Sequence, residues 1–166
     1  MNSSPQISNA KLSKDVSNLD ANVFFLSGND LSTDWHYGTM KVGDQNQSLN
    51  GITPIKMYSQ TNAKTDGLTT NAIAVKVYEF NTEVEANLYY SSIVKEIADN
   101  RGYTEISYNA DNCFLIDKSN YMVSQDVANC SVGRYVLTLS YIMEYEQVSD
   151  SEFKSILTRI LNKIYS

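Results

Sequence analysis

The stretch VGRYVLTLSYIMEY, residues 132–145, decides how this chain folds. Its side chains alternate between large apolar types and a more mixed set with a period of two, which is typical of a half-buried β-strand. One face of the predicted strand is apolar or aromatic throughout: Tyr135, Leu137, Leu139, Tyr141, Met143 and Tyr145. The other face is mixed: Val136, Thr138, Ser140, Ile142 and Glu144. We therefore expect one long strand whose first face lies against the core.

The segment that follows, SDSEFKSILTRILNKIY (149–165), predicts an amphipathic helix that folds back over this strand. Its apolar residues recur at i, i+3, i+4 spacing, which places them on one face: Phe153, Ile156, Leu157, Ile160, Leu161 and Ile164. Ser149 and Glu152 form a capping box, so the start of the helix is encoded locally. A second helix is predicted near 82–99, where Thr82 and Glu85 form another capping box.

The rest of the chain predicts further strands separated by turns. They are expected at Leu31–Val42, Thr53–Gln60, Asn71–Phe80, Tyr103–Tyr108, Cys113–Asp117 and Tyr121–Val127, with a polar loop at 61–70. Because the links within 103–145 are too short for crossover helices, neighbouring strands there must be antiparallel. The predicted fold class is α+β, with a mainly antiparallel curved sheet packed with two long amphipathic helices, at about 82–99 and 149–165. Residues 1–20 predict a polar N-terminal tether or marginal helix, and 21–166 a single α+β domain.

The composition and net charge of the chain limit the classes of partner that we expect it to bind. The chain has 166 residues, the length of one domain, with 42% hydrophobic and 19% charged residues. Its net charge of −6 and the absence of a Lys/Arg cluster argue against nucleic acid and against anionic lipid as partners. No apolar run approaches the ~18–20 residues that span a bilayer, so no transmembrane segment is predicted. With one histidine, no Cys/His zinc set can be assembled, and neither a metal nor a cofactor is predicted.

Cys113 and Cys130 are the only cysteines. They can form a structural disulfide, remain two buried thiols, or include one reactive thiol. We favour the disulfide, because a lone pair in an acidic chain rich in Asn and Ser fits an oxidising compartment. A hairpin turning about 118–120 would place Cys113 opposite Gln125, which excludes a direct cross-strand bond. The bond would then require the chain to turn after Val127 and bring Cys130 back past the first strand.

Residues Trp35, His36 and Tyr37 form a candidate binding patch. With Asp34, they bring a carboxylate, an imidazole and aromatic rings close together in the sequence. A single histidine can serve as a general base, but no Ser or Cys nucleophile is tied to it by spacing. We expect a capped turn with Trp35 filling one end of the core, and we predict no catalytic residue. The chain also has 12 tyrosines, and an exposed cluster of them would form a binding patch for a protein or a glycan.

Three segments carry a resemblance. A strand within 75–100 ends in F-N-T-E-V-E-A and opens a helix, G-R-Y-V-L-T-L-S within 132–145 precedes the last helix, and D-L-S-T-D-W occupies 30–35. This order resembles small α+β domains of archaeal and bacterial cell-surface lipoproteins, broadly the PsbP/Mog1-like architecture. The resemblance covers about the last hundred residues. It implies an extracytoplasmic, usually non-enzymatic accessory or ligand-binding role and supplies no functional residue to carry over. The chain departs from it by lacking a lipidation cysteine near residue 1.

These observations together predict a non-catalytic extracytoplasmic or cell-surface domain that binds a protein or other surface partner. That location requires a targeting segment that the given sequence does not show, since its first twenty residues lack the layout of a signal peptide. One alternative is a small hydrolase or thiol-dependent enzyme that uses His36 or Cys113/Cys130. A second alternative is a cytoplasmic assembly adaptor of the same architecture.

Overall fold

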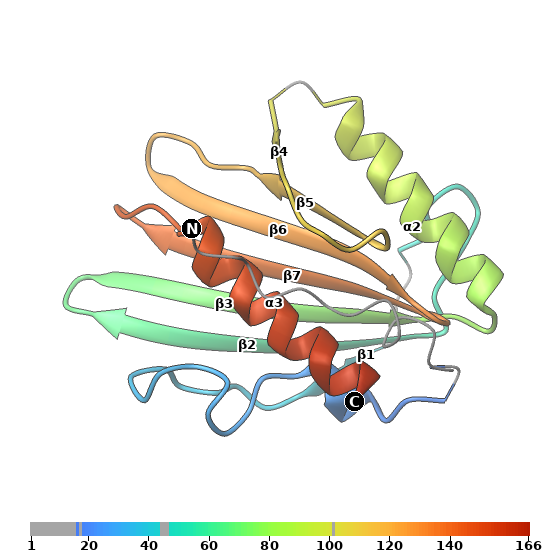
Figure 1. The fold of residues 1–166 in the computed structure, drawn as a ribbon, viewed down its shortest axis with the longest axis horizontal. Helices are drawn as coiled ribbons and strands as arrows, with labels where there is room; N and C mark the ends of the chain where they lie inside the picture. Colours follow the sequence, from blue (N-terminus) through green and yellow to red (C-terminus); the bar gives the residue numbers. More distant parts are fainter. Residues whose placement is uncertain (1–15, 17, 44–46, 101) are drawn as a thin grey trace.

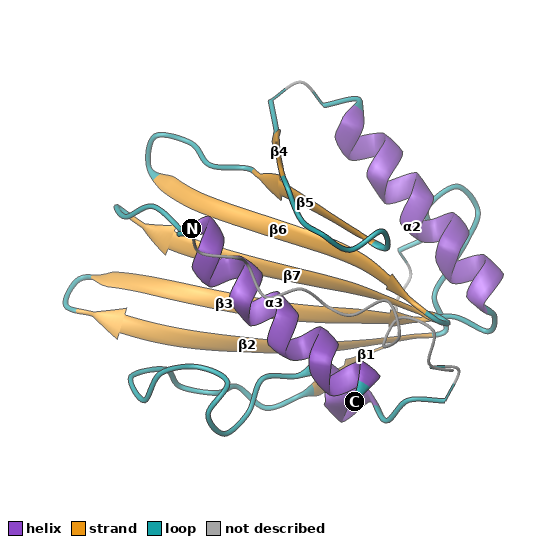
Figure 2. Ribbon diagram, in the orientation of Figure 1, coloured by secondary structure: helices purple, strands orange, loops and turns teal. Residues whose placement is uncertain are grey.

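The computed structural model describes residues 16, 18–43, 47–100 and 102–166. The fold is α+β, as predicted, with one seven-stranded antiparallel sheet in the order β1-β2-β3-β7-β6-β5-β4 (Figures 1 and 2). The elements in chain order are η1 (Ala21–Phe24), β1 (Lys41–Gly43), β2 (Lys56–Asp66), β3 (Thr69–Glu79), α2 (Glu83–Ala98), β4 (Thr104–Ile106), β5 (Cys113–Asp117), β6 (Val123–Val132), β7 (Tyr135–Glu144) and α3 (Asp150–Tyr165).

Strand β7 lies at the centre of the sheet between β3 and β6. It covers most of the predicted 132–145 strand, but the prediction is wrong at the start, where Val132 ends β6. A two-residue turn, Gly133 and Arg134, joins it to β6, so that Val132 pairs with Tyr135. Gly133 has a φ of +55°, which glycine adopts at little cost. Four of the six residues predicted for the inward face are at most 3% exposed: Tyr135, Leu137, Leu139 and Tyr141. The prediction is wrong for Tyr145, which lies beyond the end of β7 and is 76% exposed.

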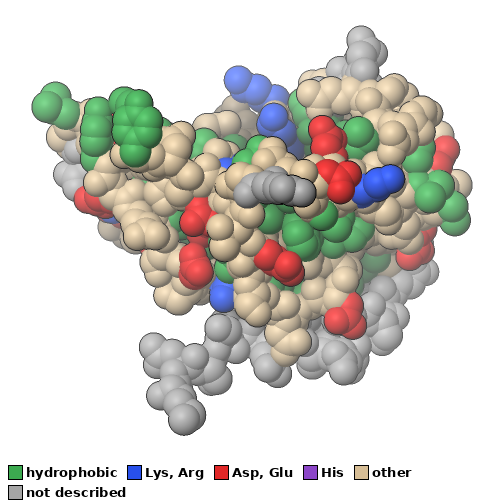
Figure 3. Space-filling view, turned by 90° about the horizontal axis from the view of Figure 1, so that it is seen from above, with side chains coloured by type: hydrophobic (Ala, Val, Ile, Leu, Met, Phe, Trp, Pro, Cys, Tyr) green, Lys and Arg blue, Asp and Glu red, His purple; other side chains and the backbone are tan. Residues whose placement is uncertain are grey.

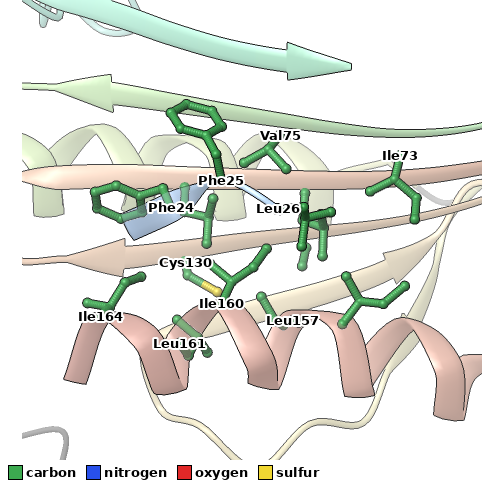
Figure 4. Close-up of a cluster of buried hydrophobic side chains, with 14 of the residues drawn as sticks. Phe24, Phe25, Leu26, Ile73, Val75, Cys130, Leu157, Ile160, Leu161 and Ile164 are labelled. Atoms are coloured by element: carbon green, nitrogen blue, oxygen red, sulfur yellow. The ribbon is translucent and has the colours of Figure 1, made fainter. Parts of the chain in front are cut away.

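The two helices cover opposite faces of the sheet. Helix α3 packs with η1 on the face that carries Ile73 and Val75, and together they enclose the larger core (Figure 4). All six residues of the predicted α3 stripe are buried there, and Cys130 belongs to the same cluster. Helix α2 lies over the other face, near one end of β6 and β7 (Figure 1). A smaller apolar cluster fills that contact: Tyr78, Phe80, Ala86, Tyr89 and Val136.

The predicted capping box is complete at α2, whereas at α3 the structure shows only the half made by Ser149. Thr82 and Ser149 accept hydrogen bonds from the backbone N–H groups of Glu85 and Glu152, three residues further on. In α2 the Glu85 carboxylate also accepts from the Thr82 N–H, which completes the capping box. Because these bonds satisfy N–H groups that the helix leaves unpaired, they determine where each helix begins.

The prediction of a loop at 61–70 is wrong. These residues continue β2 and β3 through a two-residue turn at Gly67 and Leu68. The inward positions of β2 are polar, because they hydrogen-bond to neighbouring backbone rather than pack in the core. The Gln60 amide accepts from the Leu26 N–H and donates to the Leu26 and Gly38 carbonyls. A strand with buried amides on its inner face has no apolar alternation to detect.

The predicted strand at Leu31–Val42 is also wrong for most of its length. Only Lys41–Gly43 pairs regularly with β2, and His36 forms an isolated bridge with Ala63. Near this bridge the chain approaches β2 very closely, since a Cβ on Gly38 would lie 2.1 Å from the Thr61 carbonyl oxygen. The backbone is held there by the Asn62 side chain, which accepts from the Gly38 N–H at 3.2 Å.

The register predicted for the β5–β6 hairpin is wrong as well. Strand β6 runs from Val123 to Val132 instead of ending at Val127, and Cys113 pairs directly with Cys130. The connection is a loop of residues 118–122, not a three-residue turn. Within it, the Asn120 side chain accepts from the N–H groups of Met122 and Val123. Because these bonds stabilise a wider loop, each residue of β5 meets a partner further along β6 than the shorter turn implied.

Candidate functional site

The predicted patch at Trp35, His36 and Tyr37 divides between the interior and the surface. Trp35 is 6% exposed and meets Tyr141 edge-on, with ring centroids 5.8 Å apart. The Tyr37 hydroxyl donates to the Gly28 carbonyl and accepts from a backbone N–H, so it closes a turn. His36 is exposed, while its backbone pairs with β2. Trp35 therefore fills the end of the core, and His36 is the member of the three with an exposed side chain.

Replacing His36 with alanine is expected to change the free energy of unfolding by less than about 0.5 kcal/mol, because exposed side chains without special contacts contribute little. Urea denaturation measures the change. Tyr37→Phe is the comparison and should cost about 1 kcal/mol, since it removes the hydroxyl bonded to two backbone groups. A larger loss in His36→Ala than in Tyr37→Phe would show that the imidazole has a structural or functional role that its exposure conceals.

Cys113 and Cys130 are joined in a disulfide between β5 and β6, with their Cα atoms 4.1 Å apart. They form a pair without backbone hydrogen bonds to each other, the type of antiparallel pair in which side chains come closest. The bond ties the outer strands β4 and β5 to the centre of the sheet. Since the chain has two cysteines, neither is the free thiol that a thiol-dependent enzyme requires.

Replacing both cysteines with alanine is expected to lower the free energy of unfolding by about 3 kcal/mol, as the chain-entropy model gives for a loop of this length. The domain keeps its own core, so it should remain folded with a Tm lower by roughly 6–12 °C. Thermal unfolding with and without reductant measures this. Reductant should leave the alanine variant unchanged. Two alkylatable thiols in the unreduced, denatured wild-type protein would contradict the bond.

A groove, here called the α2 groove, lies between α2 and the sheet and has a volume of about 580 Å³. Its lining comes from α2, from β3, β6 and β7, and from three connections: Gln47, Ser48, Leu49, Tyr78, Tyr89, Ile93, Glu96, Ile97, Asn100, Tyr103, Lys118, Val127, Asn129 and Thr138. Tyr89 packs against Tyr78 and Phe80, with ring centroids 5.6 and 4.9 Å away. These contacts give the groove a packed aromatic side.

Polar groups lie in the sheet side of the α2 groove. Asn129 is 4% exposed, and its side-chain oxygen accepts from the Thr138 hydroxyl at 2.9 Å. This bond leaves the amide N–H₂ of Asn129 as a donor set within the groove lining. The Lys118 ammonium lies 4.8 Å from the centre of the Tyr103 ring, a cation–π contact at the rim. The groove thus combines an apolar wall with a few fixed polar groups, as ligand sites usually do.

Burial raises the pKa of two phenols in the α2 groove, those of Tyr78 and Tyr89. It raises the pKa of Tyr89 to about 12, and the nearby Tyr78 and Glu96 add to the shift. Burial also raises the pKa of Tyr78, whose hydroxyl donates to the Gln47 side chain at 3.3 Å. At neutral pH these side chains are neutral, so they offer hydrogen bonds without charge. The lining that the structure describes contains no histidine and no cysteine.

One buried carboxyl lies outside the groove, on the face toward α3. Asp126 is 2% exposed, and one of its carboxyl oxygens has no hydrogen-bond partner. It pairs across the sheet with Asp117 on one side and Tyr141 on the other. Burial raises the pKa of Asp126 to about 7, and the carboxylates of Asp150 and Asp117 add to the shift while Lys154 opposes it. Within the described residues no set of three or more His, Cys, Asp or Glu side chains could hold a metal ion.

The α2 groove was not predicted from the sequence. On the sheet side, the groove is lined by Thr138, from the mixed face of β7, and by Asn129, its cross-strand partner in β6. Alternation marked that face as outward, and nothing local indicates that the 82–99 helix shelters part of it. The sequence did contain one signal that could have indicated the groove. It has a second amphipathic helix, and its central strand has small and polar residues on the second face.

No protein-family model matches this sequence, and no curated protein is similar to it in sequence. Among solved structures, the fold is similar to the extracellular domain of PknH from Mycobacterium tuberculosis, with a TM-score of 0.66 and 9% sequence identity. The match covers 86% of this chain and 93% of that domain. At this level of identity, the likeness shows a shared fold. No helix in the described part of the chain combines the length and apolar character that crossing a bilayer requires.

Proposed function

We propose that this chain is a non-catalytic extracytoplasmic domain that binds a protein or other surface partner, and that the α2 groove is the site of binding. The α2 groove is the observation on which this proposal rests. It is large enough for a few side chains or a small molecule, and its fixed aromatic and amide groups suit recognition. The lipoprotein-like order of segments noted in the sequence is in keeping with the same role.

Two observations support an extracytoplasmic location. The bond between Cys113 and Cys130 is of the kind that persists where thiols are oxidised, outside the reducing cytosol. The similar solved structure is itself an extracellular domain. A cytoplasmic adaptor of the same architecture would keep both cysteines reduced.

The cellular location is tested by measuring the redox state of the two cysteines in the native cells. Thiols are alkylated at the moment of lysis, and the mass of the intact protein is measured before and after reduction. Extracytoplasmic protein should carry no alkyl group before reduction and two after it. Protein that is alkylated twice before reduction would support the cytoplasmic alternative.

Binding in the α2 groove is tested with a fragment library screened by protein-observed NMR. We expect hits that shift the amide signals of Asn129 and Thr138. Ile97→Trp, which fills the groove from α2, should abolish these shifts. Leu88→Trp is the matched control, because Leu88 lies on the same helix, is 53% exposed and does not line the groove. Hits that survive in Ile97→Trp, or that map elsewhere, would refute the groove as the site.

A further inference from the structure

Three chain connections meet at one end of the sheet, here called the turn end. They are the β2–β3 turn (67–68), the β5–β6 connection (118–122) and the β7–α3 connection (145–149). The antiparallel order places them together, since β2, β5 and β7 all run toward this end (Figure 1). The opposite end contains the β6–β7 turn and the start of α2.

The turn end displays large apolar side chains at positions where polar turn residues are usual. Leu68 is 102% exposed, Tyr121 96% and Tyr145 76%, the three highest values among the exposed large hydrophobic residues. Met122, beside Tyr121, is 49% exposed. Figure 3 shows apolar side chains projecting as a group at the left, the end at which Figure 1 places the β5–β6 connection. At the opposite end, the β6–β7 turn consists of Gly133 and Arg134.

The backbone presents these side chains in a fixed arrangement. Tyr145 has a φ of +59°, a left-handed conformation that is uncommon for a bulky residue and concentrates at functional sites. Its N–H donates to the Met122 carbonyl at 3.4 Å, which joins the two connections. The Asn120 side chain holds the β5–β6 connection by accepting from the N–H groups of Met122 and Val123. Because these side chains are already positioned, less conformational entropy is lost when a partner binds them.

A hollow of about 450 Å³ lies between the β5–β6 and β7–α3 connections. Tyr121, Met122 and Tyr145 contribute its apolar lining, and Gln147 and Glu146 contribute polar groups. Tyrosine and methionine are among the residues enriched in protein interfaces, and a hollow between them can receive a side chain of a partner. The exposed aromatics and the hollow therefore belong to one surface.

The charges around the turn end are mainly acidic. Glu144 and Glu146 flank Tyr145 in the sequence. The one basic residue of the three connections, Lys118, lies over the Tyr103 ring at the α2 groove. An acidic border repels anionic lipid and attracts basic groups, so charge favours a protein partner with Lys or Arg around an apolar contact.

We propose that the turn end is a docking surface for a second protein, one that places an apolar side chain between Tyr121 and Tyr145 and sets Lys or Arg residues against Glu144 and Glu146. The hollow at the turn end shares no lining residue with the α2 groove, so the two proposals can be tested independently. Its occupant is a folded or extended protein segment of basic character.

A random-peptide library displayed on phage tests this proposal. Wild-type protein should select peptides with an apolar or aromatic residue flanked by Lys or Arg. The double variant Tyr121→Ser/Tyr145→Asn should lose at least about tenfold in affinity for those peptides; asparagine is chosen because it tolerates the left-handed backbone at 145. Val84→Ser is the matched control, because Val84 is 67% exposed on α2. Peptides that bind the double variant as well as the wild type would overturn the proposal.

Two further measurements test whether the turn end binds a lipid surface or a second copy of this chain instead. Sedimentation with phosphatidylcholine vesicles should leave the protein in solution, and analytical ultracentrifugation over a range of concentrations should show no association that depends on Tyr121 and Tyr145. Vesicle binding lost in the double variant would replace the protein partner by a lipid surface. Self-association lost in the double variant would replace it by a second copy of this chain. Equal Tm values for the variants and the wild type confirm that each remains folded.

Discussion

Replacing Leu161 with alanine is expected to lower the free energy of unfolding by about 2–5 kcal/mol. Leu161 is fully buried in α3, within the cluster that also contains Phe24, Val77 and Leu137 (Figure 4). The shorter side chain removes apolar contact and leaves a cavity that neighbours on the sheet and η1 cannot fill completely. Urea denaturation at constant pH measures the loss as a shift in midpoint with an unchanged slope.

Leu88→Ala is the matched control for this substitution. Leu88 also lies in a helix but is 53% exposed, so the same change should cost less than about 1 kcal/mol. If Leu161→Ala cost less than half a kilocalorie, or no more than Leu88→Ala, the packing of α3 against the sheet would not be as described.

Replacing Asp126 with asparagine is expected to remove a pH dependence from the stability of the domain. The pKa of this carboxyl is about 7 in the folded protein and lies near its ordinary value in the unfolded chain. Between about pH 4 and pH 7 the folded state therefore binds more protons, so the wild type loses stability as the pH rises. The loss attributable to Asp126 is at most about 4 kcal/mol. The variant, which stays neutral, should become the more stable protein at about pH 8.

Unfolding in urea at about pH 4, 6 and 8 measures this difference. The stability of Asp126→Asn relative to the wild type should rise across the series. Asp99→Asn is the control for the Asp-to-Asn change itself, because Asp99 is exposed at the end of α2. Parallel profiles for the wild type and Asp126→Asn would show that the carboxyl is already ionised in the fold at low pH.

The elements with strong local signals were predictable from the sequence. The N-cap residues Thr82 and Ser149 marked both helix starts, and the regular stripe ending at Ile164 marked the buried face of α3. The alternation in β7 identified its core face. Each of these features depends on residues close together in the chain, where spacing alone decides the geometry.

Features set by distant parts of the chain were not predictable. The inner face of β2 is polar because Gln60 and Asn62 bond to the backbone of the 26–38 segment, and no local pattern records that. The hairpin that brings Cys113 opposite Cys130 depends on side-chain bonds from Asn120, which widen the connection. A small change in loop length moves every pair along the strand.

The candidate sites were less predictable than the fold. The sequence drew attention to Trp35 and His36 because rare residue types cluster there, yet Trp35 lies in the core. The α2 groove and the turn end depend on which tyrosines remain uncovered. Tyr89 and Tyr121 look alike in the sequence, but one is 4% exposed and the other 96%.

The central position of β7 also determines the order in which the protein can assemble during synthesis. Residues 56–79 and 104–132 form two groups of strands that meet only through residues 135–144. Until the ribosome has released that segment, each group presents an unpaired strand edge, and the apolar face that α3 covers stays in water. The sheet of this domain can therefore be completed only after residues 135–144 have been synthesised.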